Sequence, residues 1–291
     1  GDLRSFRLAA KDAMRTADPA QKDNLDALQG SFKILINSFY GYTAFAQGTF
    51  NDFGMASEIT RRGREILSRM RDFLLESGAT IVEMDTDGIY FTPPPGVTDM
   101  DAMRERVQAI LPEGIEIELD ASYKAMFCYK SKNYALLGWD DRISLTGAAL
   151  KSRGLEPFQR RYMREHIELL LTDREAETDA LYERYVDDIE QHRLPLKDFA
   201  KREILSTSPA VYAEKLRNGE TKRSAAYDLV LNAKREYSQG DVVEFYVIGN
   251  RKNVSVVGNS RLLEDADPTV RDENIPYYLD KLQQLKKKFT L

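Results

Sequence analysis

The stretch Ala79–Thr92 constrains the fold of this chain more than any other. An apolar, β-branched run enters Asp85-Thr-Asp-Gly88, and a second β-rich run leaves it. Asp-Gly between two such runs is a strong signal for an antiparallel hairpin. Because strand side chains two residues apart point the same way, we expect Asp85 and Asp87 to share one face at the turn. Two carboxylates this close repel each other, which favours a bound cation; an ordinary hairpin with solvated aspartates is the alternative.

Composition excludes several classes of protein. The 291 residues can bury a core and suggest about two domains. The formal net charge of -5 argues against nucleic-acid binding over the whole surface, although a locally basic groove stays possible. The single cysteine, Cys128, rules out an internal disulfide and fits a reducing compartment, and the separation of His166 from His192 argues against a zinc site. No apolar run approaches the length of a membrane span, and no signal peptide is visible.

Helical patterns precede the hairpin. Ser5–Ala17 and Pro19–Tyr42 are predicted to form an antiparallel helical hairpin, with Asp18 as the N-cap of its second helix. Met55–Ser77 is the clearest helix, and Gly78 is expected to end it. Its arginines at positions 61, 62 and 64 are interpreted as a solvated face.

Helices and strands alternate after the hairpin. Helices on an antiparallel sheet predict an α+β fold. We expect a helix over Met100–Leu111 and strands over Gly114–Leu119, Ala125–Tyr129, Asn133–Trp139 and Arg142–Thr146, with a turn at Asp140-Asp141. Beyond Lys151–Gly154 the pattern is mainly helical, at Pro157–Leu171, Glu175–His192, Leu196–Phe199, Pro209–Asn218, Ser224–Lys234 and Pro276–Phe289, with one strand at Val242–Ile248.

Polar residues recur at helical spacing in the first two helices. Arg7 and Lys11 lie four residues apart, as do Lys33 and Asn37. If these faces converge, they suit a polyphosphate; solvated surface charges are the alternative. The next residues are Tyr40, which could press its ring on a flat ligand, and Gly41, which could end the helix or allow close approach of the backbone.

Two motifs taken together resemble a known family. Lys33-x3-Asn37-Ser-x-Tyr-Gly41 followed by Asp85-Thr-Asp87 is similar to the second and third conserved motifs of family B DNA polymerases. Further elements resemble the same family and extend the resemblance over nearly the whole chain: Arg7-x3-Lys11, Lys132-Asn-Tyr-Ala135, Arg153-Gly-Leu-Glu156, Tyr212–Leu216, Gly240–Glu244 and Tyr277-Tyr278.

The resemblance implies three parts and a set of residue roles. Residues 1–45 would be a helical fingers hairpin, 46–150 the carboxy-terminal part of an antiparallel-sheet palm with helices, and 151–291 a mainly helical thumb. Four residues would hold the incoming triphosphate: Arg7, Lys11, Lys33 and Asn37. Three pairs of residues complete the set: Tyr40 and Gly41 would line the nascent base pair, Lys132 and Tyr134 would track the primer end, and Asp85 and Asp87 would bind divalent metals, with Asp87 as the bridging ligand.

The resemblance also implies a reaction, a cofactor and partners. Template-directed nucleotidyl transfer from a dNTP to a primer 3′-hydroxyl proceeds by a two-metal mechanism, and Mg²⁺ with oxygen ligands needs no His or Cys. The partners would be primer–template DNA, dNTP and an amino-terminal polymerase segment or subunit that carries the first motif and the exonuclease. A sliding clamp is a further candidate partner. The location would be intracellular, in the cytoplasm or nucleoid, with no membrane.

Some residues depart from the family pattern. Gly88 replaces the usual Ser after Asp87, Glu83-Met84 replaces Tyr-Gly, and Ser131 and Asn133 replace basic residues. The first motif, with its metal-binding aspartate, is not found in these residues. Two further carboxylates, Glu118 and Asp120, are interpreted as ordinary strand-edge charges and not as its replacement.

The leading hypothesis is the carboxy-terminal portion of a family B DNA polymerase, either a natural split subunit or an excised fragment, since the sequence begins with Gly1 and not Met. As a second hypothesis, the chain is a non-catalytic primer–template binding or assembly module derived from a polymerase. A sugar-nucleotide transferase would account for Asp85 and Asp87 but leaves Lys33–Gly41 unexplained. A calcium loop of the EF-hand type fails on ligand spacing.

Overall fold

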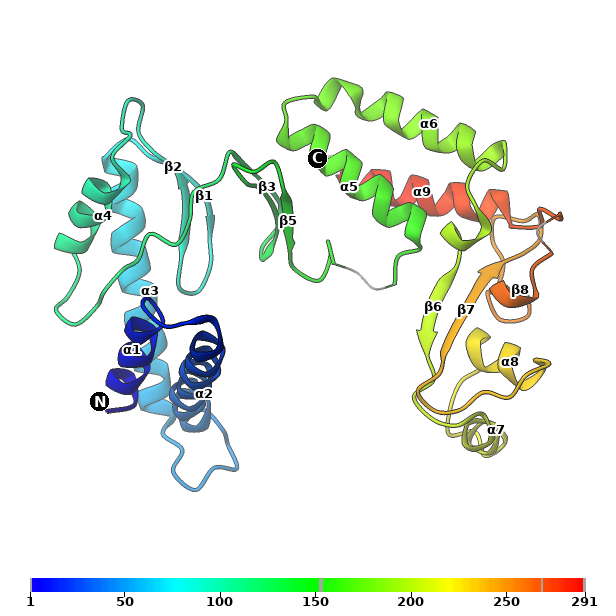
Figure 1. The fold of residues 1–291 in the computed structure, drawn as a ribbon, viewed down its shortest axis with the longest axis horizontal. Coiled ribbons are helices and arrows are strands. Elements are labelled where there is room, and N and C mark those ends of the chain that lie inside the picture. Colours follow the sequence, from blue (N-terminus) through cyan, green and yellow to red (C-terminus); the bar gives the residue numbers. More distant parts are fainter. Residues whose placement is uncertain (1, 152–153, 268, 290–291) are drawn as a thin grey trace. The chain divides into compact units, whose positions relative to one another are not determined.

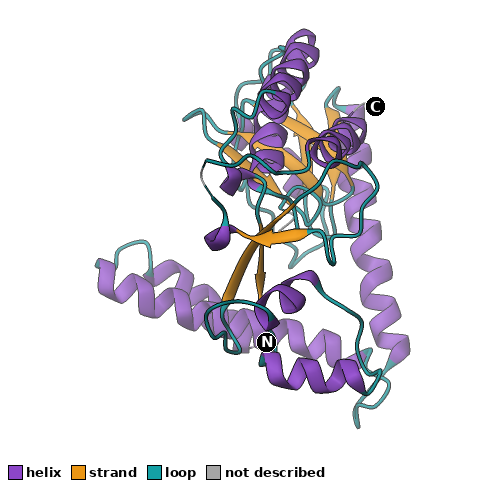
Figure 2. Ribbon diagram, turned by 90° about the vertical axis from the view of Figure 1, so that its right-hand side faces the viewer, coloured by secondary structure: helices purple, strands orange, loops and turns teal. Residues whose placement is uncertain are grey.

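The computed structural model describes residues 2–151, 154–267 and 269–289 and confirms an α+β fold (Figure 1). Helices dominate, and the strands occur in short antiparallel groups (Figure 2). The chain forms two compact units, Gly1–Leu119 and Asp120–Leu291. The boundary falls inside the range expected to be palm, and the division into fingers, palm and thumb stays a prediction. Arg153, in the expected entry to the thumb, lies outside the described residues. In the described part of the chain, no helix combines the length and apolar character needed to cross a membrane.

The first unit consists of a helical hairpin, a long helix, a β-hairpin and a short helix. These are α1 (Asp2–Ala13), α2 (Pro19–Thr43), α3 (Phe53–Glu76), β1 (Thr80–Met84), β2 (Ile89–Thr92) and α4 (Met100–Ala109). Asp18 caps α2 as predicted, because its side chain accepts a hydrogen bond from the backbone N–H of Gln21 at 2.9 Å. All four predicted helices and the hairpin of this unit are therefore confirmed, with ends shifted by up to four residues.

The β-hairpin is held against α3 and α4 by apolar side chains. Gly78 ends α3 as predicted: its φ of 88° lets the chain reverse, and Ala79 N–H donates to Leu74 O at 3.0 Å. The chain thus enters β1 directly from a fixed helix end. The small core beneath the hairpin combines the buried Leu74, Ala79, Met103 and Val107 with the partly buried Ile81, Ile89 and Phe91.

The predicted strand at Gly114–Leu119 is wrong, since these described residues form an extended segment outside any sheet. The side chain of Gln108 takes the place of a partner strand. Its Nε2 donates to Ile115 O at 2.7 Å, and its Oε1 accepts from Ile117 N–H at 3.0 Å. Of the alternating apolar residues, Ile117 contacts the core under the hairpin, whereas Ile115 and Leu119 are exposed.

The second unit contains two three-stranded antiparallel sheets and several helices. The first sheet comprises β3 (Ala125–Lys130), β4 (Asn133–Leu137) and β5 (Ile143–Thr146), and the second comprises β6 (Lys201–Ile204), β7 (Val242–Val247) and β8 (Ser260–Leu262). The helices are α5 (Pro157–Leu171), α6 (Thr178–Glu190), α7 (Pro209–Arg217), α8 (Ala225–Leu231) and α9 (Ile275–Phe289). The turn at Asp140-Asp141 is confirmed, with Gly138 N–H donating to Arg142 O at 2.9 Å.

Several predicted helices of this unit are shorter than expected, among them α8, which ends at Leu231 and not at Lys234, and two strands were not predicted. The segment expected to be helical from Glu175 begins with a 3₁₀ turn (Glu175–Glu177) before α6, and Leu196–Asp198 is a single 3₁₀ turn. β6 and β8 carry charged residues and only one apolar residue each, so their sequences give a weak strand signal.

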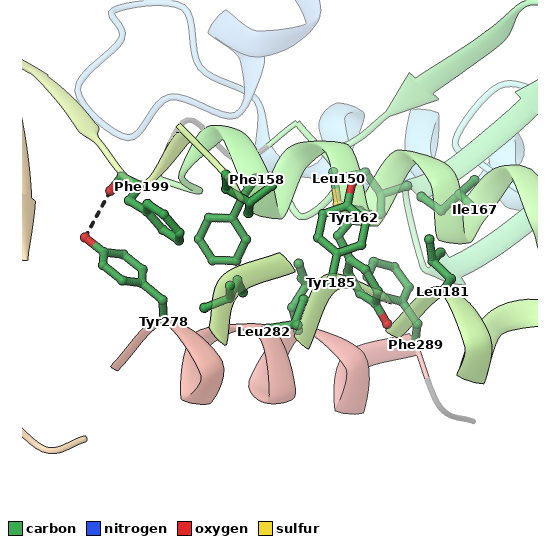
Figure 3. Close-up of a cluster of buried hydrophobic side chains, with 14 of the residues drawn as sticks. Leu150, Phe158, Tyr162, Ile167, Leu181, Tyr185, Phe199, Tyr278, Leu282 and Phe289 are labelled. Carbon is green, nitrogen blue, oxygen red and sulfur yellow. Dashed lines mark hydrogen bonds between the residues drawn. The ribbon is translucent and has the colours of Figure 1, made fainter. Parts of the chain in front are cut away.

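Aromatic residues from distant parts of the sequence form the centre of the main core (Figure 3). The rings of Phe199 and Tyr278 lie 4.6 Å apart between centroids, and Phe158 lies 5.5 Å from Phe199. The hydroxyl of Tyr278 accepts from Val247 N–H at 2.7 Å and donates to Phe199 O at 3.1 Å. It therefore joins the second sheet to the helical part of this unit.

Removing this hydroxyl is expected to destabilise the protein. Tyr278→Phe leaves a buried N–H and a buried C=O without a partner, which should lower the free energy of unfolding by about 1–3 kcal/mol. Urea denaturation followed by circular dichroism measures the change. Tyr277→Phe is the matched control, because the hydroxyl of Tyr277 makes no hydrogen bond within the described residues. Equal losses in the two variants would contradict this account.

Candidate functional site

Asp85 and Asp87 lie at the tip of the confirmed β-hairpin. Met84 pairs with Ile89, and Asp85 N–H donates to Gly88 O at 3.0 Å, so Thr86 and Asp87 occupy the centre of the turn. Gly88 thus takes the last position of the turn. A bulge between Ile81 and Glu83 interrupts the strand register shortly before Asp85.

The two aspartates differ in environment. Asp85 is half-buried, and its Oδ1 accepts hydrogen bonds from the N–H of Thr86 at 2.6 Å and from its hydroxyl at 3.1 Å. Asp87 is exposed to solvent. The structure therefore fixes the Asp85 carboxylate through Thr86 and leaves Asp87 accessible to a ligand.

The carboxylate oxygens at this tip are of the type that binds Mg²⁺, but two aspartates are too few to complete its coordination shell. Carboxylate oxygens are the ligands that Mg²⁺ prefers. Within residues 2–151, 154–267 and 269–289, however, no group of three or more His, Cys, Asp or Glu side chains is placed to hold a metal ion. Asp85 and Asp87 could thus supply part of a coordination shell, and the remaining ligands would have to come from substrate, water or another segment.

The predicted triphosphate-binding residues lie on α1 and α2. Phe6 of α1 stacks on Phe32 of α2, with ring centroids 6.0 Å apart. Next to this contact, Arg7 Nε approaches Gln29 Oε1 at 3.4 Å. Because Gln29 precedes Lys33 by one helical turn, Arg7 reaches the same side of α2 as Lys33. Gln29 was not predicted as a site residue, although its spacing from Lys33 would have been the signal.

Lys11 contacts a different part of the first unit. Its Nζ lies 3.4 Å from each carboxylate oxygen of Glu118, and Arg4 forms a second pair with Glu116 at 3.3 Å. Because α1 and α2 form a hairpin, residues after Arg7 run away from Lys33. The structure thus brings Arg7 near the α2 residues but holds Lys11 on the extended segment after α4. Glu116 and Glu118 were not predicted to take part, because their alternation with Ile indicated a strand.

Asn37, Tyr40 and Gly41 lie in the last turns of α2. Lys33, Asn37 and Tyr40 recur at three- and four-residue spacing and share one exposed face. Gly41 does not end the helix, which continues to Thr43. A Cβ placed on Gly41 would have no described atom within 4 Å, so this position is open to a ligand.

Lys132 and Tyr134 lie on the β3–β4 hairpin of the second unit. Lys132 has a φ of 61° in the turn, and Gly147 packs so closely against it that a Cβ there would lie 2.2 Å from Lys132 O. Asn133 Oδ1 accepts from Ala149 N–H at 2.8 Å. The turn that carries Lys132 is therefore fixed on both sides, with its side chain exposed, whereas Tyr134 is buried.

The arginines early in α3 are largely neutralised by a neighbour. Arg61 and Arg62 both donate to Glu58 at 2.7 Å. These hydrogen bonds, first from Arg61 and then from Arg62, lower the pKa of Glu58 to about 2. The interpretation of this region as a solvated, charged face agrees with these contacts.

Comparison with known proteins places this geometry in a family. The family described as DNA polymerase family B matches residues 2–288. The DNA polymerase of Desulfurococcus sp. (strain Tok) is 24% identical over 292 aligned residues, which cover 96% of this chain and 36% of that protein. The DNA polymerase of Thermococcus gorgonarius is 32% identical over 162 residues, 53% of this chain and 21% of that protein.

A solved structure has the same fold. The family B DNA polymerase from the hyperthermophilic archaeon Pyrobaculum calidifontis superposes with a TM-score of 0.72 at 19% identity, covering 99% of this chain and 37% of that one. This chain thus spans a little over a third of the length of such relatives. The resemblance inferred from the two motifs is confirmed over nearly the whole sequence, and the chain belongs to DNA polymerase family B.

Proposed function

We propose that this chain is the carboxy-terminal part of a DNA-directed DNA polymerase that transfers nucleotides from dNTP to a primer 3′-hydroxyl. One observation carries the proposal: both family motifs lie in one compact unit and present solvent-accessible side chains, with Lys33, Asn37, Tyr40 and Asp87 exposed. Lys33–Gly41 occupies an open face of α2, and Asp85–Asp87 lies at the tip of a hairpin packed on α3 and α4.

The proposed roles follow from chemistry and position. The cations of Arg7, Lys11 and Lys33, with the amide of Asn37, hold and orient the triphosphate. Tyr40 and the open Gly41 line the nascent base pair, and the exposed Lys132 follows the primer end on its fixed hairpin, in which Tyr134 is buried. Asp85 and Asp87 would hold Mg²⁺. When bound, this ion would activate the primer hydroxyl and neutralise the leaving pyrophosphate.

The proposed site needs a carboxylate from outside these residues. We assign it to the polymerase segment with the first motif, whether it belongs to the same polypeptide or to a separate subunit. Primer–template DNA is the second macromolecular partner, and it would be held mainly through its phosphates. A sliding clamp and an intracellular location belong to the same proposal.

Primer extension with Mg²⁺ tests the proposed function. The chain alone should extend a labelled primer at a rate near background. Adding a polypeptide from the same organism that carries the first motif should restore synthesis. No synthesis under any such complementation, together with salt-dependent primer–template binding, would favour the non-catalytic binding module instead.

The pairing of Lys11 with Glu118 leads to a testable prediction for nucleotide binding. A triphosphate must displace Glu118 to reach Lys11, and an exposed ion pair is worth up to about 1 kcal/mol. Glu118→Gln should therefore tighten binding of a fluorescent dNTP analogue about two- to fivefold in the reconstituted enzyme. The matched control is Glu113→Gln, which removes the same charge from the same segment at an exposed position without an ion pair among the described residues. Equal dNTP affinities in the two variants would show that Glu118 does not compete with the triphosphate for Lys11.

A further inference from the structure

One face of α2 carries a stripe of large apolar side chains that no described element covers. Leu28, Leu35, Phe39 and Tyr42 fall within about 60° of one another around the helix axis. Their exposed fractions are 47%, 49%, 66% and 41%. We call these four residues the apolar stripe. None of the 25 residues of α2 is buried, which is unusual for a helix with this many large apolar side chains.

The contact with α1 does not use the apolar stripe. α1 packs on the neighbouring face of α2, where Leu25, Phe32 and Ile36 are partly buried and Phe6 stacks on Phe32 (Figure 1). The apolar stripe lies beside this contact and remains exposed after the helical hairpin has formed. It therefore constitutes an additional surface of α2.

The loop after α2 extends this surface. Three phenylalanines follow the apolar stripe within eleven residues, with exposed fractions of 50% at Phe45, 81% at Phe50 and 56% at Phe53. Phe45 and Phe50 lie in this loop, and Phe53 is the first residue of α3. The loop is fixed to α2, because Thr49 N–H donates to the hydroxyl of Tyr42 at 2.9 Å. The apolar stripe and this loop thus present exposed apolar side chains on one ordered segment.

The charge distribution on α2 indicates a protein partner for this surface. The residues along and beside the apolar stripe are uncharged, and the hydroxyls of Ser31 and Ser38 donate to carbonyls of α2 itself. A nucleic acid would require cations to meet its phosphates. The charged residues of α2 all project on the far side of the helix: Lys22, Asp23, Asp26 and Lys33.

We infer that the apolar stripe and its loop bind the polymerase segment that carries the first motif, an inference that rests on the proposed function. In the Desulfurococcus and Pyrobaculum polymerases the matched region is 36% and 37% of the chain, so most of each polypeptide lies outside it and can cover such a surface. Contiguous exposed apolar area of this kind marks a protein interface. Because Lys33 and Asn37 lie on another face of the same helix, docking on the apolar stripe leaves them open to nucleotide.

A binding experiment with matched variants tests this inference. The probe is the polypeptide from the same organism that carries the first motif, mixed with the full 291-residue chain and analysed by gel filtration with light scattering and by titration. Leu35→Ser and Phe39→Ser should each weaken the complex at least tenfold. Ile204→Ser is the control, since Ile204 is 68% exposed on β6 of the second unit, against 66% for Phe39; its affinity should stay within twofold of the unsubstituted chain. Circular dichroism verifies that each variant keeps its helix content.

The outcomes separate this inference from the proposed function. Unchanged binding in Leu35→Ser and Phe39→Ser, or no binding by the unsubstituted chain, would overturn the inference. A homodimer that Phe39→Ser dissociates would also overturn it, because the stripe would then belong to a second copy. Primer extension by the mixture of the unsubstituted chain and the first-motif polypeptide reports on the proposed function independently. If the mixture synthesises DNA but Phe39→Ser binds the polypeptide as well as the unsubstituted chain does, only the interface is refuted. If the substitution weakens binding but the mixture synthesises no DNA, only the polymerase activity is refuted.

Discussion

Asp87→Asn should abolish Mg²⁺-dependent primer extension by the reconstituted enzyme, with a fall in rate of at least about 10³-fold. The substitution keeps the size of the side chain and removes the charge that would face the metal. Loss of a metal ligand removes several kcal/mol of transition-state stabilisation, and each 1.36 kcal/mol corresponds to about tenfold in rate. The measurement is single-turnover extension of a labelled primer at saturating dNTP.

A second aspartate in a hairpin turn provides the matched control for Asp87. Asp140 lies in the turn between β4 and β5, is exposed, and accepts a hydrogen bond from Arg142 N–H at 3.2 Å. Asp140→Asn makes the same chemical change and should leave the rate within about twofold. Asp85→Asn should also reduce the rate strongly. Extension by Asp87→Asn at the rate of the Asp140 variant would exclude Asp87 from the reaction.

The parts of the fold that the sequence predicts well are those with local signals at both ends. α5 has the predicted bounds because Pro157 occupies a first helical position and Glu156 and Gln159 form a capping box. The β-hairpin is predicted equally well, since apolar β-branched runs flank its turn. Such features depend on neighbouring residues alone, so they can be identified from a single sequence.

Other parts of the fold depend on contacts between distant residues. β6 and β8 form because β7 lies between them and pairs with both. Conversely, Gly114–Leu119 alternates like a strand but finds the side chain of Gln108 where a partner strand would be needed. Alternation shows only that a segment could present an apolar face, whereas strand formation also requires a partner that the local sequence does not reveal.

In the candidate site, too, some features have local sequence signals and others depend on contacts between distant residues. The motifs name Lys11, Asp85 and Asp87 from sequence, and the structure adds how each is held. The contact of Lys11 with Glu118 joins residues 107 positions apart, and no spacing rule would suggest it. Exposure of the apolar stripe on α2 was also beyond prediction, because an amphipathic pattern shows that a face is apolar but not whether another element covers it.

A buried carboxylate in the second unit should have the largest effect on stability. The side chain of Glu273 has no exposed surface; it contacts His192 Nδ1 at 2.8 Å and accepts from Arg271 Nε at 3.0 Å. Arg271 also donates to Leu194 O at 2.7 Å, so the three side chains fasten the loop after α6 to the strand-like segment before α9. Glu273→Ala leaves Arg271 without its carboxylate partner and should lower the free energy of unfolding by about 3–5 kcal/mol.

An exposed ion pair, Arg174–Glu177, provides the control for Glu273→Ala. Glu177→Ala removes a carboxylate that pairs with Arg174 at 2.6 Å on the surface, and solvent screening should make its cost far smaller than that of Glu273→Ala. Urea denaturation of both variants at neutral pH measures the two losses. If the loss for Glu273→Ala were as small as that for Glu177→Ala, the buried cluster would not stabilise the second unit.

The contribution of Glu273 should disappear in acid. Burial raises the pKa of Glu273, but hydrogen bonds from Arg271 and His192 outweigh this effect and hold the pKa below its usual value of 4.5. A carboxyl group with a lowered pKa in the folded state stabilises the protein fully above the pKa of the unfolded chain, and this stabilisation is lost as the pH falls through the folded value. The difference in unfolding free energy between the unsubstituted protein and Glu273→Gln should therefore shrink as the pH falls below about 4.5. A difference that grows on acidification would show that the protonated carboxyl group, and not the carboxylate, is the form that the fold stabilises.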